Sequence, residues 1–256
     1  MVYLYLTQED TENLLSLNSS CLKNEIVFKN VSYAIKDEIN EKECIEIEEN
    51  PNVIFKDVNF KLKKGEKVAL TGKNGSGKST IMKSLLNIVD FQGSIEIDGI
   101  SNKTITRRSL YKMITYVPQN TILMNDTILF NIMFFNKEAT YEEVESVCKE
   151  LDIHHIIMRF PKGYHSEVGP DGKNLNGSLR QKIFYARAFL RNSPVYLFDE
   201  PDNNLDAGQG IDFIKYVLKS ERFREKLVFV ITHEMNLVNL FDKKLFLENK
   251  KIVLLN

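Results

Sequence analysis

The sequence predicts a mixed α/β fold with a parallel sheet at its centre. Short apolar runs at residues 68–70, 195–198 and 227–231 are rich in β-branched and aromatic residues, which is typical of strands buried on both faces. A glycine-rich turn at 72–80 follows the first run and precedes a helical pattern. An amphipathic pattern at 211–218 lies between the other two runs, as a helical crossover between parallel strands requires.

The composition is that of an ordinary soluble globular protein. The 256 residues suffice for one large α/β domain or two small ones, and 43% of them are hydrophobic and 27% charged. The 34 basic residues nearly cancel the 35 acidic ones, so no nucleic-acid partner is expected. The three cysteines are far apart in the sequence, which favours a reducing compartment.

No segment of the sequence is apolar for long enough to cross a membrane. A spanning helix needs about 18 consecutive apolar residues, and no window has them. The N-terminus also lacks the basic and then apolar pattern of a secretory signal. If the protein works at a membrane, we expect another chain or a missing segment to supply the spans.

The chain opens with residues 1–22, where Thr7 and an acidic turn precede a leucine cluster at 14–17. A capping threonine with an acidic first turn is typical of a short helix, so we expect a linker or docking helix here. A frayed terminus is the alternative interpretation. The main domain is expected over 23–256.

Strand-like pieces follow at 26–28, 31–35, 53–55 and 58–62. Between them, residues 36–52 contain seven acidic side chains and alternate at strand period around Ile45 to Glu48. This pattern favours a solvated hairpin extension, and a docking surface for a basic partner is the alternative.

The middle of the chain changes from strands to helices. Residues 93–99 predict a strand that ends in a turn at Asp98 and Gly99, and 116–119 predict a strand that ends in a loop. From 127 to about 191, apolar residues recur every three or four positions. We therefore expect a helical subdomain over about 120–192.

The turn at 72–80 (GKNGSGKST) has the pattern of a phosphate-binding loop. Glycines allow successive backbone N–H groups to converge on phosphate oxygens at the positive end of a helix. Lys78 would reach the β- and γ-phosphates, and the Ser79 hydroxyl would bind Mg²⁺. An ordinary Gly/Ser loop is the alternative, which the strand and helix on either side disfavour. The candidate nucleotide-binding residues are Gly72, Asn74, Gly75, Ser76, Gly77, Lys78, Ser79 and Thr80.

A second motif, which is acidic, complements the glycine-rich loop. Asp199 and Glu200 directly follow the apolar run 195–198. Such a strand places its first carboxylate beside the magnesium ion, and the next carboxylate can polarise an attacking water. Acidic residues end many strands, so the motif gains its meaning from the phosphate-binding loop upstream.

These motifs, in this order, resemble those of the ATP-binding cassette (ABC) family from about residue 25 to the C-terminus. Gln119 falls at the glutamine that contacts magnesium and the transport subunit, and His233 falls at the switch histidine that senses the γ-phosphate. Residues 175–181 (LNGSLRQ) fall at the signature motif, and 203–206 (NNLD) fall at the dimer-contact loop. The resemblance implies a P-loop NTPase (RecA-like) core with an antiparallel β subdomain and an α-helical subdomain.

Short phrases within the helical region resemble the exporter class of this family. They are found at 125–128 (NDTI), 131–132 and 167–169 (EVG). Residues 157–164 (IMRFPKGY) are similar to the mitochondrial half-transporters, which are implicated in exporting glutathione-linked sulphur compounds.

The chain departs from the family pattern at two places. The signature is usually LSGGQ, but this chain offers Asn176, Gly177, Ser178 and Leu179. Asn176 can still donate through its amide, Ser178 adds a Cβ where the backbone approaches closely, and Leu179 cannot form a hydrogen bond. Ile35 also replaces the aromatic ring that stacks on adenine in the family. Tyr33, on the same strand face, is a substitute, although a role as a core aromatic is the simpler interpretation.

The resemblance implies an ATPase that powers transport. Lys78, Glu200 and His233 would be the catalytic residues, with Glu200 orienting water and His233 stabilising charge at the γ-phosphate. Ser79, Gln119 and Asp199 would surround Mg²⁺. The alternative is a soluble cassette ATPase that acts on translation or nucleic-acid complexes. A catalytically inactive regulatory cassette is disfavoured because the catalytic positions are intact.

The implied partners are a membrane-spanning domain and a second cassette. Each ATP site would be composite, with Asn176, Gly177 and Ser178 completing the site of the opposite subunit. The altered signature favours a heterodimer with a chain that has an intact one, and a homodimer is the alternative. The cassette would be membrane-associated, on the cytosolic side or, if the mitochondrial resemblance holds, on the matrix side.

Overall fold

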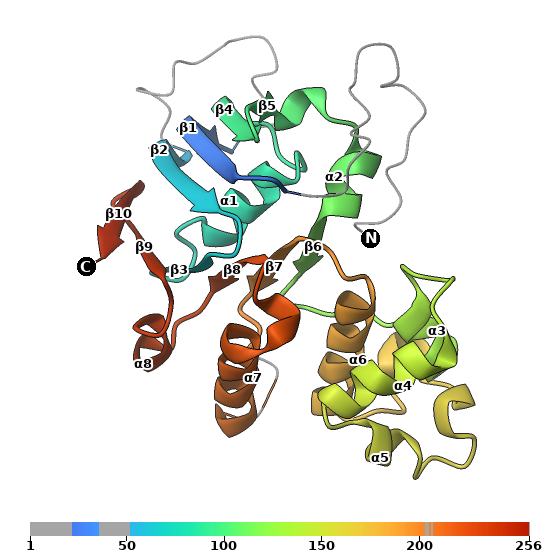
Figure 1. The fold of residues 1–256 in the computed structure, drawn as a ribbon. Helices are drawn as coiled ribbons and strands as arrows, with labels where there is room; N and C mark the ends of the chain where they lie inside the picture. Colours follow the sequence, from blue (N-terminus) through green and yellow to red (C-terminus); the bar gives the residue numbers. More distant parts are fainter. Residues whose placement is uncertain (1–21, 36–51, 203–204, 206, 256) are drawn as a thin grey trace. The chain divides into compact units, whose positions relative to one another are not determined.

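The computed structural model describes residues 22–35, 52–202, 205 and 207–255 (Figure 1). The chain divides into two compact units. The first comprises the described parts of 1–64 together with 72–114 and 247–253, and the second comprises 65–71, 115–246 and 254–256. The expected N-terminal helix and most of the acidic segment 36–52 lie outside the described residues.

The first unit contains a four-stranded sheet in the order β2-β1-β4-β5, in which every neighbouring pair is antiparallel. The strands are β1 (Glu25–Ala34), β2 (Val53–Lys63), β4 (Gln92–Ile97) and β5 (Ile100–Ser101). Its helices are α1 (Lys78–Leu85) and α2 (Arg107–Met113), with a 3₁₀ turn η1 (Asn102–Thr104). The antiparallel β subdomain predicted from the sequence is therefore present.

The strand pieces that the sequence separates are continuous in the structure. β1 runs through Asn30 and β2 runs through Asp57, although both residues adopt a positive φ, of 49° and 53°. The Asn59 side chain accepts from the Asn30 backbone N–H at 2.9 Å and donates to the Asn30 side chain at 2.9 Å. These bonds, together with a register shift between Phe28 and Val31, carry the ladder across the irregularity.

The six-stranded sheet has the order β10-β9-β3-β8-β7-β6. Its strands are β3 (Lys67–Gly72), β6 (Ile114–Val117), β7 (Val195–Asp199), β8 (Leu227–Ile231), β9 (Lys243–Glu248) and β10 (Lys251–Leu255). β3, β8 and β7 pair in parallel, and every residue of the three is buried. Leu70, Ile231 and Asp199 are register partners, so the carboxyl ends of these strands lie level with one another.

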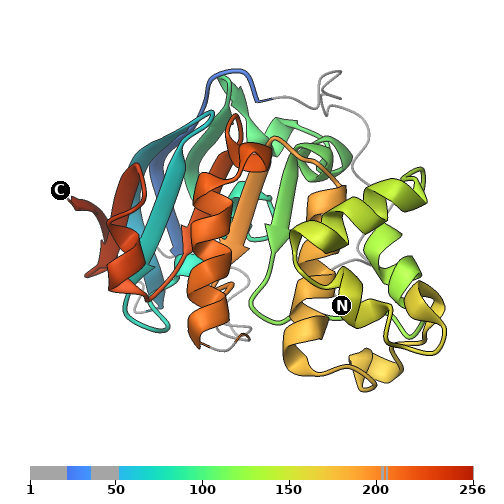
Figure 2. The ribbon, with the colours of Figure 1, turned by 60° about the horizontal axis from the view of Figure 1, so that its bottom comes forward.

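The second unit contains both helices and short 3₁₀ turns. The helices are α3 (Ile128–Met133), α4 (Tyr141–Glu150), α5 (His154–Ile157), α6 (Gly177–Leu190), α7 (Ala207–Lys219) and α8 (Met235–Val238), with 3₁₀ turns η2 (Gly163–His165), η3 (Pro170–Gly172) and η4 (Glu221–Phe223). α3, α4 and α6 contact one another, as Figure 1 shows. Figure 2 shows α7 alongside the strands of this unit. Phe213 of α7 stacks on Tyr185 of α6, with the ring centroids 3.9 Å apart. No helix within the described ranges has the length and apolar character of a membrane span.

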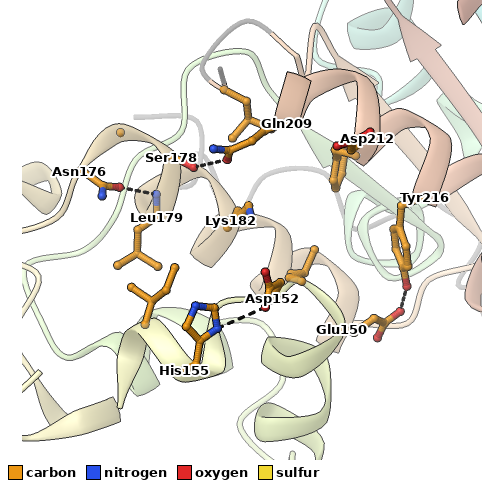
Figure 3. Close-up of a pocket in the computed structure, with 15 residues that line it drawn as sticks. Glu150, Asp152, His155, Asn176, Ser178, Leu179, Lys182, Gln209, Asp212 and Tyr216 are labelled. Carbon is orange, nitrogen blue, oxygen red and sulfur yellow. Dashed lines mark hydrogen bonds and ion pairs between the residues drawn. The ribbon is translucent and has the colours of Figure 1, made fainter. Parts of the chain in front are cut away.

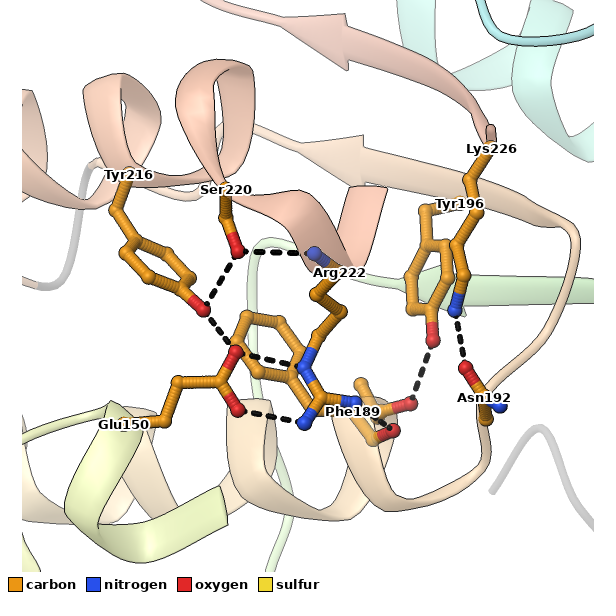
Figure 4. Close-up of polar contacts among 9 residues, drawn as sticks. Glu150, Phe189, Asn192, Tyr196, Tyr216, Ser220, Arg222 and Lys226 are labelled. Atoms are coloured by element: carbon orange, nitrogen blue, oxygen red, sulfur yellow. Dashed lines mark hydrogen bonds and ion pairs between the residues drawn. The ribbon is translucent and has the colours of Figure 1, made fainter. Parts of the chain in front are cut away.

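An ion-pair network ties α4 to the segment after α7 (Figure 4). Arg222 donates from Nε and Nη2 to the two carboxylate oxygens of Glu150, at 2.7 and 2.5 Å. Tyr216 also contacts this carboxylate, and Ser220 donates to the Tyr216 hydroxyl. Burial opposes the ionised form of Glu150, but the hydrogen bonds from Arg222 and Tyr216, together with the charges of Arg222 and Lys226, outweigh it and lower the pKa of the carboxyl. The ion pair therefore links the end of α4 to η4.

Candidate functional site

The loop between β3 and α1 has a backbone that only glycine can adopt at two points. A Cβ on Gly77 would lie 2.3 Å from Ile54 Cγ2, and a Cβ on Gly72 would lie 2.5 Å from the Leu247 carbonyl oxygen. Their φ angles, 102° and 146°, also lie in the region that disfavours side chains. The loop therefore keeps the close approach of backbone groups that a phosphate-binding turn requires.

The start of α1 leaves polar groups available for an anion. Gly77, the N-cap residue, supplies no side-chain hydrogen bond to the helix. Ser76 Oγ is buried and has no hydrogen-bond partner within the described chain. Lys78 is buried, and its Nζ donates to the carbonyls of Gly72 and Lys73 at 3.1 and 3.0 Å. The phosphates of a nucleotide would find three suitable groups here. These are the N-terminus of α1, the Ser76 hydroxyl and the Lys78 ammonium.

The carboxyl end of β7 presents the two predicted carboxylates differently. Asp199 is the last residue of the strand, is only 4% exposed, and accepts a hydrogen bond from the Tyr116 hydroxyl at 2.8 Å. Glu200 leaves the strand with a φ of 49°, and its backbone N–H donates to the Ile231 carbonyl at 3.1 Å. A positive φ on a non-glycine residue is strained backbone, which persists where the surroundings enforce it.

Gln119 and His233 both hydrogen-bond the Glu200 carboxylate. Gln119 Nε2 donates to Oε2 at 2.7 Å, and His233 Nε2 lies 3.0 Å from Oε1. These three residues, named here the Glu200 cluster, come from the loop after β6, the end of β7 and the end of β8. The Glu200 side chain is 15% exposed and that of His233 is 36% exposed, so solvent reaches the cluster. The structure thus brings together three residues that lie far apart in the sequence.

The signature segment, residues 175–179, starts α6 and is closed by bonds within the chain. Asn176 is the N-cap residue, and its side chain accepts from the Leu179 N–H at 2.8 Å. The Ser178 hydroxyl donates to Gln209 of α7 at 2.8 Å. Leu179 is 3% exposed and belongs to the hydrophobic core of the second unit. Nothing lies within 4 Å of a Cβ added to Gly177, so this glycine faces open space.

Asn176, Gly177 and Ser178 line a hollow of about 1070 Å³ (Figure 3). Its walls also include the C-terminal end of α4, α5 and α7, with Lys182 and Asp212 among its charged residues. The signature segment therefore lies beside an open concave surface, separate from the Glu200 cluster in sequence and in contacts.

Tyr33 is half-buried on β1 and pairs in register with Phe55, with the ring centroids 5.9 Å apart. Ile35, at the position where the family has its aromatic ring, is 50% exposed. The Tyr33 ring therefore has a packing partner within the first unit, as a core aromatic would.

The sequence did not single out three residues that contact the candidate site. They are Tyr116, which bonds Asp199, Gln209, which bonds Ser178, and Asp202, which accepts from Thr232 at 3.3 Å. Burial, together with the nearby carboxylates of Glu234 and Glu200, raises the pKa of the Asp202 carboxyl. Proximity to a motif was the only available signal, because these pairings join distant parts of the chain.

Comparisons with known proteins agree with these motifs. The family model described as ABC transporter matches residues 55–203, more than half of the chain. A probable ABC transporter ATP-binding/permease protein of Haemophilus influenzae is 36% identical over 200 residues, covering 78% of this chain and 36% of that protein. The ABC transporter ATM1 of Toxoplasma gondii is 37% identical over 205 residues, covering 80% of this chain and 18% of that protein.

A solved structure extends the likeness to the fold. It is described as a bacterial Atm1-family ABC exporter with ATP bound, and it superposes with a TM-score of 0.79 at 28% identity. The match covers 95% of this chain and 41% of that one, so this chain spans less than half of the proteins described here. The chain belongs to the ABC transporter family and is homologous to the nucleotide-binding domains of its exporters.

Proposed function

We propose that the chain is the ATP-hydrolysing cassette of an exporter, which couples ATP binding, cassette dimerisation and hydrolysis to transport across a membrane. The observation that carries the proposal is the Glu200 cluster, in which an amide and an imidazole hold a solvent-accessible carboxylate at the end of a buried strand. A carboxylate held in this way is suited to orient and polarise a water molecule. The alternative of a soluble cassette acting on nucleic-acid complexes lacks support, since the relatives described above are transporters.

In this proposal the loop after β3 binds the phosphates, and residues that follow β7 and β8 act in hydrolysis. Lys78 and the loop amides bind the phosphates of ATP, Glu200 orients water, and His233 stabilises charge at the γ-phosphate. The full set of phosphate-binding residues is Gly72, Asn74, Gly75, Ser76, Gly77, Lys78, Ser79 and Thr80. Tyr33 is the candidate for contact with the adenine ring.

Oxygen donors at Ser79, Gln119 and Asp199 suit a magnesium ion, because Mg²⁺ prefers hydroxyl, carbonyl and carboxylate ligands. When bound, the ion would neutralise charge on the β- and γ-phosphates. The Tyr116 hydroxyl, 2.8 Å from Asp199, would hold that carboxylate in place.

The proposed partners are a membrane-spanning domain and a second cassette. Ile122, Met124 and Phe130 follow Gln119 and are 54%, 45% and 39% exposed, which suits contact with another protein surface. The second cassette is either a copy of this chain or a related chain, with Asn176, Gly177 and Ser178 facing its ATP. We place the cassette on the cytosolic or matrix side of the membrane.

The proposed organisation is a linker or docking helix at 1–22 followed by the nucleotide-binding domain at 23–256. Within that domain, we assign about 120–192 to the helical subdomain. The positions of α3 to α6 support this assignment.

Replacing the loop lysine tests the ATP site. Lys78→Ala should abolish tight MgATP binding, because it removes the ammonium that would pair with the phosphates. Equilibrium binding of a fluorescent ATP analogue measures this. Lys83→Ala removes the same charge from the same helix and should bind as the wild type does. Equal affinity of the wild type and Lys78→Ala would contradict the assignment of this loop.

Fractionation of the native protein tests the coupling to a membrane. A transporter cassette should sediment with membranes and co-purify with membrane spans, whether these are fused or on another chain. A native protein that stays entirely in the supernatant would argue for the soluble alternative.

A further inference from the structure

Two of the buried polar side chains of helix α6 are hydrogen-bonded to each other. Gln181 is 1% exposed and Tyr185 is 0% exposed. Gln181 Nε2 donates to the Tyr185 hydroxyl oxygen at 2.9 Å. Burying such groups is costly unless they are hydrogen-bonded, so their remaining partners indicate what the pair holds.

Gln181 and Tyr185 connect the loop that contains Gln119 to the loop that contains Glu200. At one end, the Thr121 hydroxyl donates to Gln181 Oε1 at 2.9 Å, two residues after Gln119 in the sequence. At the other end, the Tyr185 hydroxyl donates to the Pro201 carbonyl at 2.5 Å, one residue after Glu200. A continuous chain of hydrogen bonds therefore runs through α6 from the Gln119 loop to the Glu200 loop.

The bond to Pro201 bears on the conformation of Glu200. The Glu200 backbone is fixed on one side by its N–H bond to Ile231 and on the other by the Tyr185 hydroxyl on the next carbonyl. Between these two anchors, Glu200 keeps a φ of 49°. A strained φ persists only where its surroundings determine it, and here the two bonds do so.

We propose that Tyr185 is a positioning residue for ATP hydrolysis. Through Pro201 it holds Glu200 in the orientation in which Gln119 and His233 reach the carboxylate, and through Gln181 and Thr121 it fixes the Gln119 loop relative to Glu200. This inference rests on the proposed function of the Glu200 cluster.

The ring and the hydroxyl of Tyr185 have separable roles. The ring stacks on Phe213 at 3.9 Å and meets Phe198 edge to face, with the ring centroids 6.5 Å apart. A phenylalanine keeps these contacts and loses only the bonds to Pro201 and Gln181. Tyr185→Phe therefore tests positioning without removing the packing.

Tyr196 provides a matched control on β7. It is also a fully buried tyrosine, and its hydroxyl donates to the Ala188 carbonyl of α6 at 3.4 Å. Tyr196→Phe thus removes a buried phenolic hydroxyl from the same core but does not touch the loops at Gln119 or Glu200.

The experiment measures steady-state ATP hydrolysis and amide hydrogen exchange on the full chain and both variants. We expect Tyr185→Phe to lower kcat by about tenfold with KM for ATP unchanged, since even a 1 Å misplacement of a catalytic group can cost about 10²-fold. Exchange in a peptide spanning 199–202 should become faster in this variant. Tyr196→Phe should leave kcat and exchange at 199–202 as in the wild type. Thr121→Val removes the hydrogen bond to Gln181 at the other end of this series of hydrogen bonds, and it should lower kcat by less than Tyr185→Phe does.

Unchanged kcat in Tyr185→Phe, or equal losses in Tyr185→Phe and Tyr196→Phe, would overturn the inference. If the wild-type chain neither binds nor hydrolyses ATP, the proposed function fails. In that case, exchange at 199–202 still decides whether Tyr185 holds the Glu200 loop, with equal rates in wild type and Tyr185→Phe counting against it.

Discussion

The Glu200 cluster and the signature segment 175–179 belong to the same unit, but their polar groups are used differently. In the cluster, Gln119 and His233 hold a carboxylate that remains open to solvent. In the signature segment, the Asn176 oxygen caps its own helix, Ser178 bonds α7, and Leu179 lies in the core. The Glu200 carboxylate can therefore still meet water, whereas the side chains of the signature segment stabilise helix α6 and the core.

This difference indicates how a composite ATP site can be divided between subunits. The catalytic residues expected to act on ATP bound to this chain match the family pattern, whereas the residues expected to face ATP on a partner do not. Selection on one half of a site need not preserve the other half if another chain supplies it. Substitutions in either region test this difference.

The largest effect is expected from Glu200→Gln. The amide keeps the shape of the side chain but loses the charge that polarises water, so hydrolysis should fall by at least about 10²-fold while ATP binding persists. The variant should accumulate as an ATP-bound dimer, which size exclusion with a hydrolysis assay measures. Glu234→Gln removes a carboxylate next to His233 and should retain activity. Hydrolysis at the wild-type rate in Glu200→Gln would remove the distinction between the two regions.

A smaller effect is expected from Leu179→Gln, which restores the family residue at the last signature position. Leu179 is 3% exposed within the core, so the new amide would be buried without a partner. We expect a loss of about 1 to 3 kcal/mol in the free energy of unfolding, measured by urea denaturation. Leu179→Met, which conserves volume and polarity, is the control. A glutamine variant as stable as the wild type would mean that this residue is not committed to the core.

The sequence predicted β3, β7 and β8 of the six-stranded sheet well, because complete burial of these strands leaves continuous apolar runs. It placed the helix of 211–218 too late, since α7 already begins at Ala207. Gly208 and Gly210 lower the helix propensity there, but a Cβ on Gly210 would lie only 2.9 Å from Asp202 Cβ, which gives this glycine a packing reason. Propensity does not record such a contact.

Several short elements were not predicted at all. α2, α8, β9 and β10 have between four and seven residues each, which is too short for a periodic pattern to be distinctive. For the site, the motifs predicted which residues matter, but not the bonds of Tyr116 and Tyr185, because these join segments far apart in the chain.

The smallest effect is expected from restoring part of the signature, and it distinguishes the heterodimer from the homodimer. The test leaves Leu179 unchanged because this residue is buried in the core. Asn176→Ser with Ser178→Gly restores the two signature residues that are not buried. Serine is as good an N-cap as asparagine, so the start of α6 should survive the change. If the chain needs a partner with an intact signature, the wild type alone should hydrolyse ATP poorly, and the double variant should gain about tenfold, or about 1.4 kcal/mol of transition-state stabilisation. Adding Glu200→Gln to the double variant should abolish the gain, which shows that it arises at the same site. A wild-type chain that hydrolyses ATP briskly by itself, with no gain from the double change, would favour a homodimer in which the Asn176 amide serves as donor.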